Sequence, residues 1–325
     1  MPPKSYRPPF TITSAILDQV AAILMLVGKY EGLSSPAPQP QLRRKNRIQT
    51  VQSTLSIEGN SLSEEQVTAI LEEKRVIGPK RDVLEVQNAL RVYAESSSFV
   101  PADERHLLSA HKKLMRGLIP DAGRYRKGSV GIIEGSKIAH VAPQAKQVQR
   151  LMSELFAFLR ADRETHPLLK ASIFHYEFEF IHPFADGNGR MGRLWQHVLL
   201  RAFHPIFEHL PFESLIKENQ ATYYASLRAA DRAGNSTPFI EFSLRMIALS
   251  MGEFFEQLKP APVTNEGRLE RARSHFQKSA FARKTYSALF KNISAPTASR
   301  DLALGVEQGL LVRVGQKALA RYRFR

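Results

Sequence analysis

The sequence has no cysteine, only one tryptophan among 325 residues and no long apolar run. Without cysteine the chain cannot form a disulfide, a thiolate metal site or a cysteine nucleophile. The longest apolar run near the amino terminus, residues 20–27, is much shorter than the roughly 20 residues that a membrane-spanning helix needs, and it lacks the layout of a signal peptide. We therefore expect a cytoplasmic protein with no membrane partner.

Acidic residues are also scarce, with 31 Asp and Glu against 46 Lys and Arg, which gives a formal net charge of +15. Residues 259–325 carry 14 of the basic residues and only 4 acidic ones, so they contribute +10 of this charge. A solvated basic surface and a contact with nucleic acid both explain such a segment. The composition leaves both interpretations open.

The clearest chemistry lies in residues 182–193, which read HPFADGNGRMGR. His182 is a candidate base, because imidazole accepts a proton near neutral pH. Asp186 offers the hard oxygen that Mg²⁺ prefers when it also binds phosphates. The alternative is a glycine-rich turn whose histidine and arginines satisfy buried polar groups.

The second half of this stretch predicts a binding site for phosphate. Gly187, Asn188 and Gly189 let the backbone approach a ligand, and free amides at the start of the next helix attract an anion. Arg190 and Arg193 are three residues apart, hence on one helix face, where guanidinium groups suit phosphate oxygens.

These residues match the pattern His-x-Phe-x-Asp/Glu-Gly-Asn-Gly-Arg-x-x-Arg at all eight specified positions. The chain thus resembles the Fic family of protein adenylyltransferases. The resemblance extends to residues 123–126 and 140–143 upstream and to residues 223–227 downstream, and so covers the middle half of the chain.

The resemblance implies that ATP lies across the loop with Mg²⁺, or alternatively Mn²⁺, held by Asp186. His182 then removes the proton from a Tyr, Thr or Ser hydroxyl of a target protein, and AMP is transferred to that oxygen. Asn188 is expected to bind a phosphate oxygen. Tyr223 and Tyr224 are candidates for the adenine side, although an aromatic pair on a helix is as often part of a core.

Two further features follow from the same resemblance. Family members that transfer phosphate carry lysine in place of the second glycine of the loop, and Gly189 therefore favours AMP transfer. Phe184 is expected to anchor the loop on the core. His175, by contrast, is expected to be a satisfied core histidine.

Residues 130–133 and 138–141 predict a β-hairpin around a turn at residues 134–137. It resembles the flap of the family, on which an extended target segment docks by adding a strand. The candidate docking residues are Val130, Ile132, Ile133 and Ile138.

Residues 54–59 fit the inhibitory pattern of the family, Ser/Thr-x-x-x-Glu-Gly/Asn. Thr54 and Glu58 are four residues apart and share a helix face. By resemblance, Glu58 forms a salt bridge with Arg193 and withdraws it from the γ-phosphate of ATP. An ordinary glutamate at the end of a helix is the alternative, and the sequence does not decide whether Glu58 also serves removal of AMP.

The fold class that we expect is mainly α, with a Fic-type helical core, the hairpin flap and a C-terminal winged helix-turn-helix domain. The predicted boundaries are a helical region with the inhibitory motif at 1–100, the catalytic core at 101–258, a linker at 259–268 and the winged domain at 269–325. Helical periodicity and capping signals predict helices over residues 12–30, 41–59, from about 63 onward, 103–116, 147–161, 168–181, 194–203, 212–218, 220–233 and 238–258. The helix over 168–181 is apolar all round and should be central.

In the last domain we expect helices at 269–290 and 295–308 and strands at 310–314 and 318–324. Thr297, Ser299 and Arg300 would lie on the leading turn of the second helix. The turn between the strands, residues 315–319, holds only one basic residue, so DNA, a target protein and a second copy in a homodimer all remain candidate partners. A DNA-binding regulator is thus the alternative to an adenylyltransferase.

Overall fold

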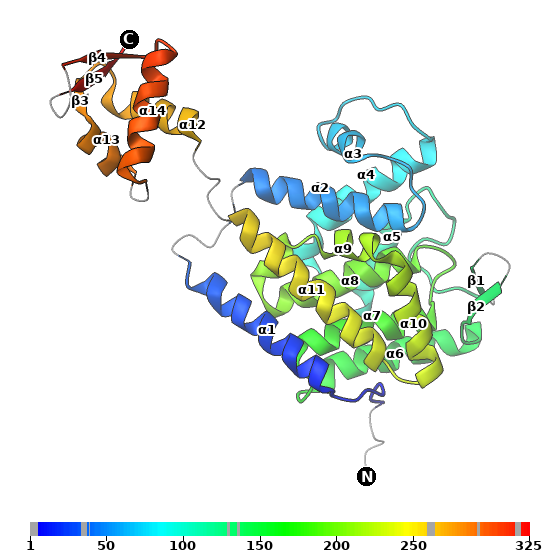
Figure 1. Cartoon of the computed structure of the whole chain (residues 1–325). Helices are drawn as coiled ribbons and strands as arrows, with labels where there is room; N and C mark the ends of the chain where they lie inside the picture. Colours follow the sequence, from blue (N-terminus) through cyan, green and yellow to red (C-terminus); the bar gives the residue numbers. More distant parts are fainter. Residues whose placement is uncertain are drawn as a thin grey trace. The chain divides into compact units, whose positions relative to one another are not determined.

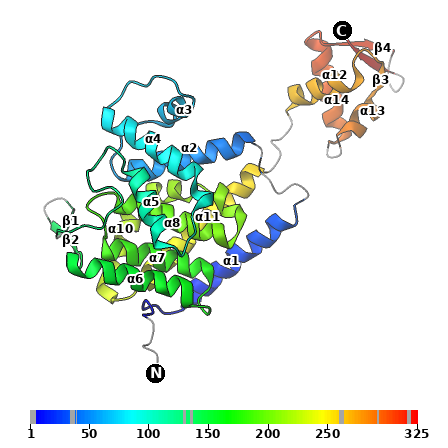
Figure 2. The same ribbon diagram turned by 180° about the vertical axis from the view of Figure 1, so that it is seen from behind.

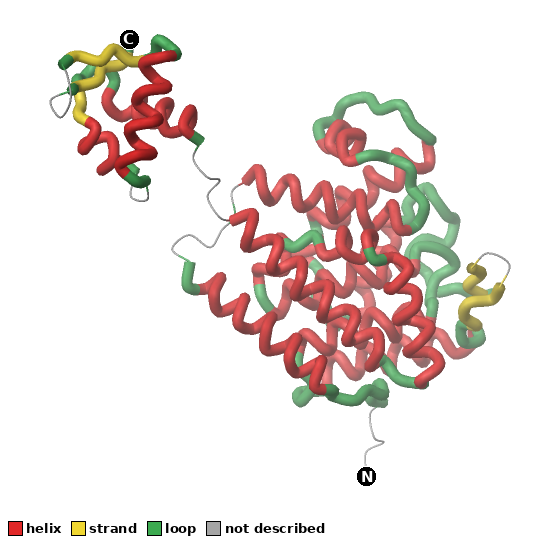
Figure 3. The backbone as a smooth tube through the Cα atoms, in the orientation of Figure 1, coloured by secondary structure: helices red, strands yellow, loops and turns green. Residues whose placement is uncertain are grey.

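The computed structural model describes residues 6–33, 38, 40–128, 131–134, 137–258, 264–290, 293–315 and 320–325. The chain divides into two compact units, Met1–Glu256 and Gln257–Arg325. Helices dominate both units (Figure 1, Figure 3), and the prediction of a mainly α protein is confirmed. Among the described residues, no helix is both long and apolar enough to cross a membrane.

The described part of the first unit is a succession of helices interrupted by one hairpin. In chain order they are α1 (Ser14–Glu31), α2 (Pro40–Ile57), α3 (Glu64–Leu71), α4 (Lys80–Ala94), η1 (Ser96–Ser98), α5 (Glu104–Leu114), β1 (Gly131–Glu134), β2 (Lys137–Val141), α6 (Ala145–Ala161), α7 (Pro167–Ile181), α8 (Asn188–Phe203), η2 (Pro205–His209), α9 (Phe212–Glu218), α10 (Gln220–Ala233) and α11 (Thr237–Leu258).

Helices α7 and α8 pack against each other in the middle of this unit (Figure 1, Figure 2). Most of α7 is buried, as its apolar sequence predicts. Gly192 permits close packing, since a Cβ there would lie 2.6 Å from Glu179 Oε1 and 2.9 Å from His175 Cδ2. A side chain at position 192 would therefore displace the Glu179 carboxylate and the buried His175 ring.

Helix α8 begins at Asn188, six residues before the predicted start at 194. The N-cap is Gly187, whose φ of 85° is a conformation that favours glycine. The predicted phosphate-binding residues therefore lie on the first turns of a helix that packs directly on the core.

The polypeptide from α2 to α4 follows the sequence signals only in part. Gly59 ends α2 with a φ of 90°, and Ser63 and Gln66 form a capping box at the start of α3. Helix α4 was not predicted. Its apolar positions recur at helical spacing, but Pro79 precedes it without a side-chain cap and charged residues fill its first turn.

The hairpin lies where the sequence predicts it. Strands β1 and β2 pair antiparallel, with Ile132 opposite His140 and Ile133 opposite Ile138. The register shifts between Ile132 and Ile133, which is the sign of a local bulge.

The second unit contains α12 (Asn265–Phe276), β3 (Phe281–Ala282), α13 (Arg283–Leu289), α14 (Ala295–Glu307), β4 (Leu311–Val314) and β5 (Arg321–Phe324). Its three strands form a sheet in the order β3-β5-β4. The predicted single helix over 269–290 is wrong: Gln277 adopts a φ of 50° and Phe281 pairs with Tyr322 of β5. The predicted linker is too long, because Thr264 caps α12 and that helix begins at Asn265.

A small core of its own stabilises the second unit. Aromatic and aliphatic side chains from every element form it, namely Leu269, Ala272, Phe281, Tyr286, Phe290, Ala298, Leu302, Leu311 and Phe324. Beside this core, Asp301 is only 2% exposed and accepts two hydrogen bonds from Arg268, at 2.6 and 2.7 Å, and one from the Tyr286 hydroxyl at 3.1 Å.

We predict that Asp301→Ala lowers the free energy of unfolding of the second unit by about 3 kcal/mol, because it removes the buried carboxylate that accepts from Arg268 and from the Tyr286 hydroxyl. Hydrogen exchange of the α14 amides in the full chain measures the change. Glu307→Ala, an exposed change on the same helix, serves as the control and should have an effect below about 0.5 kcal/mol. Equal protection in the two variants would contradict the prediction.

Candidate functional site

The predicted base, His182, lies at the end of α7 in a left-handed conformation with φ 48° and ψ 60°. Residues other than glycine rarely adopt this conformation, and it persists only where the surroundings hold it. Here the His182 amide donates to Phe178 O at 2.9 Å, and its carbonyl accepts from Arg126 Nε at 2.8 Å. The end of the helix and the start of the loop are thus fixed at this residue.

Arg126 holds several backbone carbonyls at once and is only 6% exposed. Besides His182 O, it donates to Gly128 O at 2.8 Å, Pro143 O at 2.6 Å and Ile181 O at 3.3 Å. Gly128 and Pro143 lie on either side of the hairpin in sequence. One buried guanidinium therefore connects both ends of the hairpin to the residue that carries the candidate base.

The loop is anchored on α5 through His111 and Phe184. Their rings stack with centroids 3.6 Å apart and planes 3° from parallel. His111 Nδ1 accepts from the Gly123 amide at 2.8 Å, so the proton must lie on Nε2, which contacts Asp186 O at 3.0 Å. Burial lowers the pKa of His111 to about 4 and keeps the ring neutral. Phe184 is thus an anchor, as expected.

The Asn188 side chain bonds to the backbone of the loop, and its expected contact with a phosphate oxygen stays a prediction. Its Oδ1 accepts from the Phe184 amide at 2.8 Å and its Nδ2 donates to Phe184 O at 2.9 Å. Both amide groups thus brace the loop, and the residue is 2% exposed. What remains for an anion at this end of α8 are the backbone amides of the first turn.

Arg193 is completely buried on α8 and is paired with α2. Its Nε donates to Thr54 Oγ1 at 2.8 Å, and its Nη2 donates to Thr54 O at 3.0 Å and to Glu58 Oε1 at 2.7 Å. Burial by itself lowers the pKa of Arg193, but the Glu58 carboxylate more than offsets this, so the net pKa is raised and the guanidinium stays charged. The structure thus contains the salt bridge between Glu58 and Arg193.

The Glu58 carboxylate also lies against Gly189. A Cβ on Gly189 would overlap Glu58 Oε1 and would come within 3.2 Å of Arg193 Nη1. Glu58 therefore occupies the place at the amino end of α8 where the helix dipole would hold an anion. A side chain at position 189 would not fit beside Glu58 in this arrangement.

Arg190 and Arg193 are held by different carboxylates: Glu58 pairs with Arg193, whereas Glu85 and Asp186 pair with Arg190. Arg190 is 4% exposed; its Nη1 lies 3.2 Å from Glu85 and its Nη2 lies 2.8 Å from Asp186 Oδ1. In this conformation the Arg190 guanidinium braces Asp186 instead of facing solvent.

Asp186 is the one predicted metal ligand. Its Oδ1 also accepts from the Gly187 amide at 2.6 Å, and its Oδ2 lies 3.1 Å from Arg81 Nη2. Within the described ranges, no three Cys, His, Asp or Glu side chains converge as a metal-binding group. A single carboxylate that is 37% exposed fits Mg²⁺ only where bound phosphates supply further ligands.

The two tyrosines differ in position. Tyr223 is 1% exposed and its hydroxyl contacts His175 Nε2 at 3.1 Å, so it packs in the core, and its contact with adenine stays a prediction. His175 Nδ1 contacts Gln196 Oε1 at 2.6 Å, and burial lowers the pKa of His175 to about 3. The prediction of a satisfied core histidine is confirmed. Tyr224 is partly buried, and its contact with adenine stays a prediction.

Of the candidate docking residues, Val130 lies outside the described residues. Ile132, Ile133 and Ile138 lie in the paired strands of the hairpin. Their role in docking a target stays a prediction.

Four residues at the site were not identified from the sequence: Arg81 and Glu85 on α4, His111 on α5, and Arg126. Arg126 lies within residues 123–126, which carry the family resemblance, but the sequence does not show that its side chain binds backbone carbonyls of the loop. Arg81 and Glu85 are about a hundred residues from the loop in sequence, and no local spacing could reveal that contact.

Comparison with known proteins places this site in a family. Residues 101–200 match the model of the Fic/DOC family. The crystal structure of a Fic family protein from Desulfovibrio desulfuricans G20 is 40% identical, covers 98% of both chains and superposes with a TM-score of 0.77.

Two curated relatives are named as adenylyltransferases. Protein adenylyltransferase Fic from Nematostella vectensis is 27% identical over 255 residues, which are 74% of this chain and 56% of the relative. Protein adenylyltransferase fic-1 from Caenorhabditis elegans is 30% identical over 233 residues, 67% of this chain and 43% of the relative. The chain thus spans only about half the length of these two proteins. From the loop, the family match and the full-length structural relative, we conclude that the chain belongs to the Fic/DOC family.

Proposed function

We propose that the chain transfers AMP from ATP to a hydroxyl side chain of a target protein. The observation that carries this proposal is the convergence of His182, the exposed carboxylate of Asp186 and the amino end of α8 within one anchored loop. The names of the curated relatives support the same chemistry. The target is a Tyr, Thr or Ser side chain.

In the proposed reaction, His182 accepts the proton of the target hydroxyl. The hydroxyl oxygen forms a bond to the α-phosphorus of ATP, the bond from that phosphorus to the bridging oxygen breaks, and pyrophosphate leaves with the bonding electrons. Charge accumulates on the phosphate oxygens during this step, and the preorganised amides at the start of α8 are suited to stabilise it. Asp186 would hold Mg²⁺, which when bound neutralises phosphate charge.

Arg193 is the proposed ligand of the distal phosphates. Its Nη1 is buried and has no hydrogen-bond partner among the described residues, and it lies close to Gly189. An unpaired buried donor on a charged guanidinium is costly, which favours an anion at this position. Glu58 competes for that place, and we propose that it inhibits the reaction.

The first prediction concerns His182. His182→Ala should abolish AMP transfer while leaving ATP binding within about threefold of the unmodified protein, because the imidazole acts as a base and not as a phosphate ligand. Incorporation of labelled AMP and a calorimetric ATP titration measure the two effects. His275→Ala, an exposed histidine of the second unit, is the control. Undiminished transfer by His182→Ala would refute the proposed base.

The second prediction concerns Glu58. Loss of its charge-assisted bond to Arg193 is worth on the order of 2 kcal/mol, or about thirtyfold in productive ATP binding. Glu58→Gly should therefore raise self-AMPylation at least tenfold, and adding Arg193→Ala should remove the gain.

Glu73→Gly is a matched control for this change. Glu73 is exposed and has a φ of 57°, so glycine is tolerated there and the same charge is lost away from the site. A Glu58→Gly protein no faster than the Glu73→Gly control would show that Glu58 has only a structural role.

We also propose that the second unit is a winged helix-turn-helix. One feature of this unit favours a second function. A hollow of about 930 Å³ lies between α13, α14 and the strands, and Arg283, Lys284 and Arg313 line it. None of its described lining residues is acidic. This arrangement supports binding of a polyanion such as duplex DNA. Homodimer formation and target docking are the alternatives for this surface.

The DNA prediction is tested with the full chain. Replacing Arg283, Lys284 and Arg313 by alanine should weaken binding to a duplex and lower the slope of log K against log salt by up to about 3, since each phosphate contact contributes about 0.9. Replacing Arg271, Arg273 and Lys278 removes the same charge from outside the hollow and is the control. Equal loss in both triple variants, or no binding at low salt by the unmodified chain, would remove this function.

A further inference from the structure

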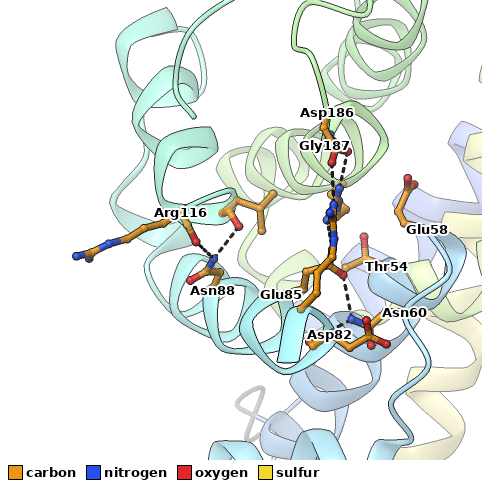
Figure 4. A network of polar contacts seen from close by, with 12 residues as sticks. Thr54, Glu58, Asn60, Asp82, Glu85, Asn88, Arg116, Asp186 and Gly187 are labelled. Carbon is orange, nitrogen blue, oxygen red and sulfur yellow. Dashed lines mark hydrogen bonds and ion pairs between the residues drawn. The ribbon is translucent and has the colours of Figure 1, made fainter. Parts of the chain in front are cut away.

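A chain of polar contacts runs from the end of α2 through α4 to the loop (Figure 4). Asn60 Nδ2 donates to Glu85 Oε2 at 3.0 Å, and Glu85 Oε1 lies 3.2 Å from Arg190 Nη1. Arg190 Nη2 then donates to Asp186 Oδ1 at 2.8 Å, which also accepts from the Gly187 amide. Two residues of the sequence motif, Gly187 and Arg190, therefore hold the Asp186 carboxylate, and Glu85 from outside the motif holds Arg190.

The inner part of this chain is buried. The side chains of Glu85 and Arg190 are 9% and 5% exposed, whereas that of Asp186 is 37% exposed. Ion pairs at the surface contribute little, but a buried charge whose partner is removed is strongly destabilised. Glu85 therefore determines where the Arg190 guanidinium lies, and through it where Asp186 points.

The same contacts begin next to the inhibitory glutamate. Asn60 follows Glu58 by two residues, and it also donates to Asp82 O at 3.2 Å, while its Oδ1 accepts from the Leu62 amide at 3.2 Å. Movement of the end of α2 would accordingly change the hydrogen bonding of Glu85. Hydrogen bonds and ion pairs through α4 thus connect the segment after Glu58 to the loop.

Arg81 is the exposed member of the cluster. It lies one turn before Glu85 on α4, with its Nε 3.3 Å from Glu85 Oε1 and its Nη2 3.1 Å from Asp186 Oδ2. Its side chain is 59% exposed, so this contact is weak and easily replaced. The Asp186 oxygen that faces Arg81 is the one not already bonded to Arg190 and Gly187.

We propose that Glu85 and Arg190 are positioning residues that hold the Asp186 carboxylate ready for a divalent cation bound together with nucleotide phosphates. Asn60 links this pair to the end of the inhibitory helix. The catalytic consequence of this inference rests on the proposed AMP transfer. The orientation of Asp186 does not, because a measurement of Mn²⁺ binding reports it directly.

The test uses the full chain and Mn²⁺ as the probe. Free Mn²⁺ is followed by electron paramagnetic resonance in the presence of a non-hydrolysable ATP analogue. Glu85→Gln, which keeps the shape of the side chain and removes its charge, should weaken Mn²⁺ binding at least tenfold. Arg190→Lys keeps the charge but cannot bridge Glu85 and Asp186, and it should weaken binding in the same direction.

Asp82→Asn is the matched control. Asp82 lies on the same helix and its Oδ2 accepts from the Ser61 amide at 2.9 Å and hydroxyl at 2.7 Å, so it holds the same segment without touching Arg190. It should change Mn²⁺ binding less than twofold. Unchanged Mn²⁺ binding in Glu85→Gln, or equal weakening in Asp82→Asn, would overturn the proposal.

Kinetics separate this proposal from the proposed function. In a Glu58→Gly background, Glu85→Gln should raise the KM for Mg²⁺-ATP at least tenfold and change kcat less than threefold. If Glu58→Gly transfers no AMP to any protein, the proposed function fails while the Mn²⁺ titration still decides the role of Glu85. If it transfers AMP and Glu85→Gln leaves KM unchanged, the positioning role is refuted.

Discussion

The buried guanidinium of Arg193 is the constraint on which the site depends. A charge that is completely removed from water must be paired, or its desolvation would destabilise the fold. Thr54, on α2, and Glu58, the residue that follows this helix, supply that pairing. The position of α2 over the amino end of α8 is therefore a requirement of folding as well as a feature of the site. Any ligand that takes Arg193 away from Glu58 has to provide a comparable anion.

Contacts within the chain hold the loop in shape. Stacking of Phe184 on His111, the amide bonds of Asn188 and the carbonyl bonds of Arg126 each fix a different part of it. The strained backbone of His182 is tolerable because these contacts surround it. In the proposed reaction, such an arrangement would place the reacting groups before the substrate binds and would reduce the entropy lost on binding. The packing that fixes the loop thus also fixes the ion pairs of Arg190 and Arg193 on α8.

Sequence patterns predicted the helical class, the central α7 and the hairpin, because apolar periodicity and turn residues are local signals. These patterns failed where contacts between residues far apart in the sequence determine the structure. The short strand at Phe281 exists only because β5 pairs with it, and Tyr223 is buried by α7 and α11, so neither is visible in its own segment. Identities in the motif placed His182, Asp186 and Arg193 at one site. They could not show that Arg190 turns toward Glu85, because α4 enters the site from another part of the chain.

Arg126 anchors both the hairpin and His182. The same guanidinium binds Gly128 O and Pro143 O, at the two roots of the hairpin, and the carbonyl of the residue that carries the imidazole. If a polypeptide segment paired with β1 or β2, the distance from that segment to His182 would be set by Arg126. Selection among substrates would then depend on how many residues separate the paired segment from the reacting hydroxyl, and the surrounding side chains would matter much less.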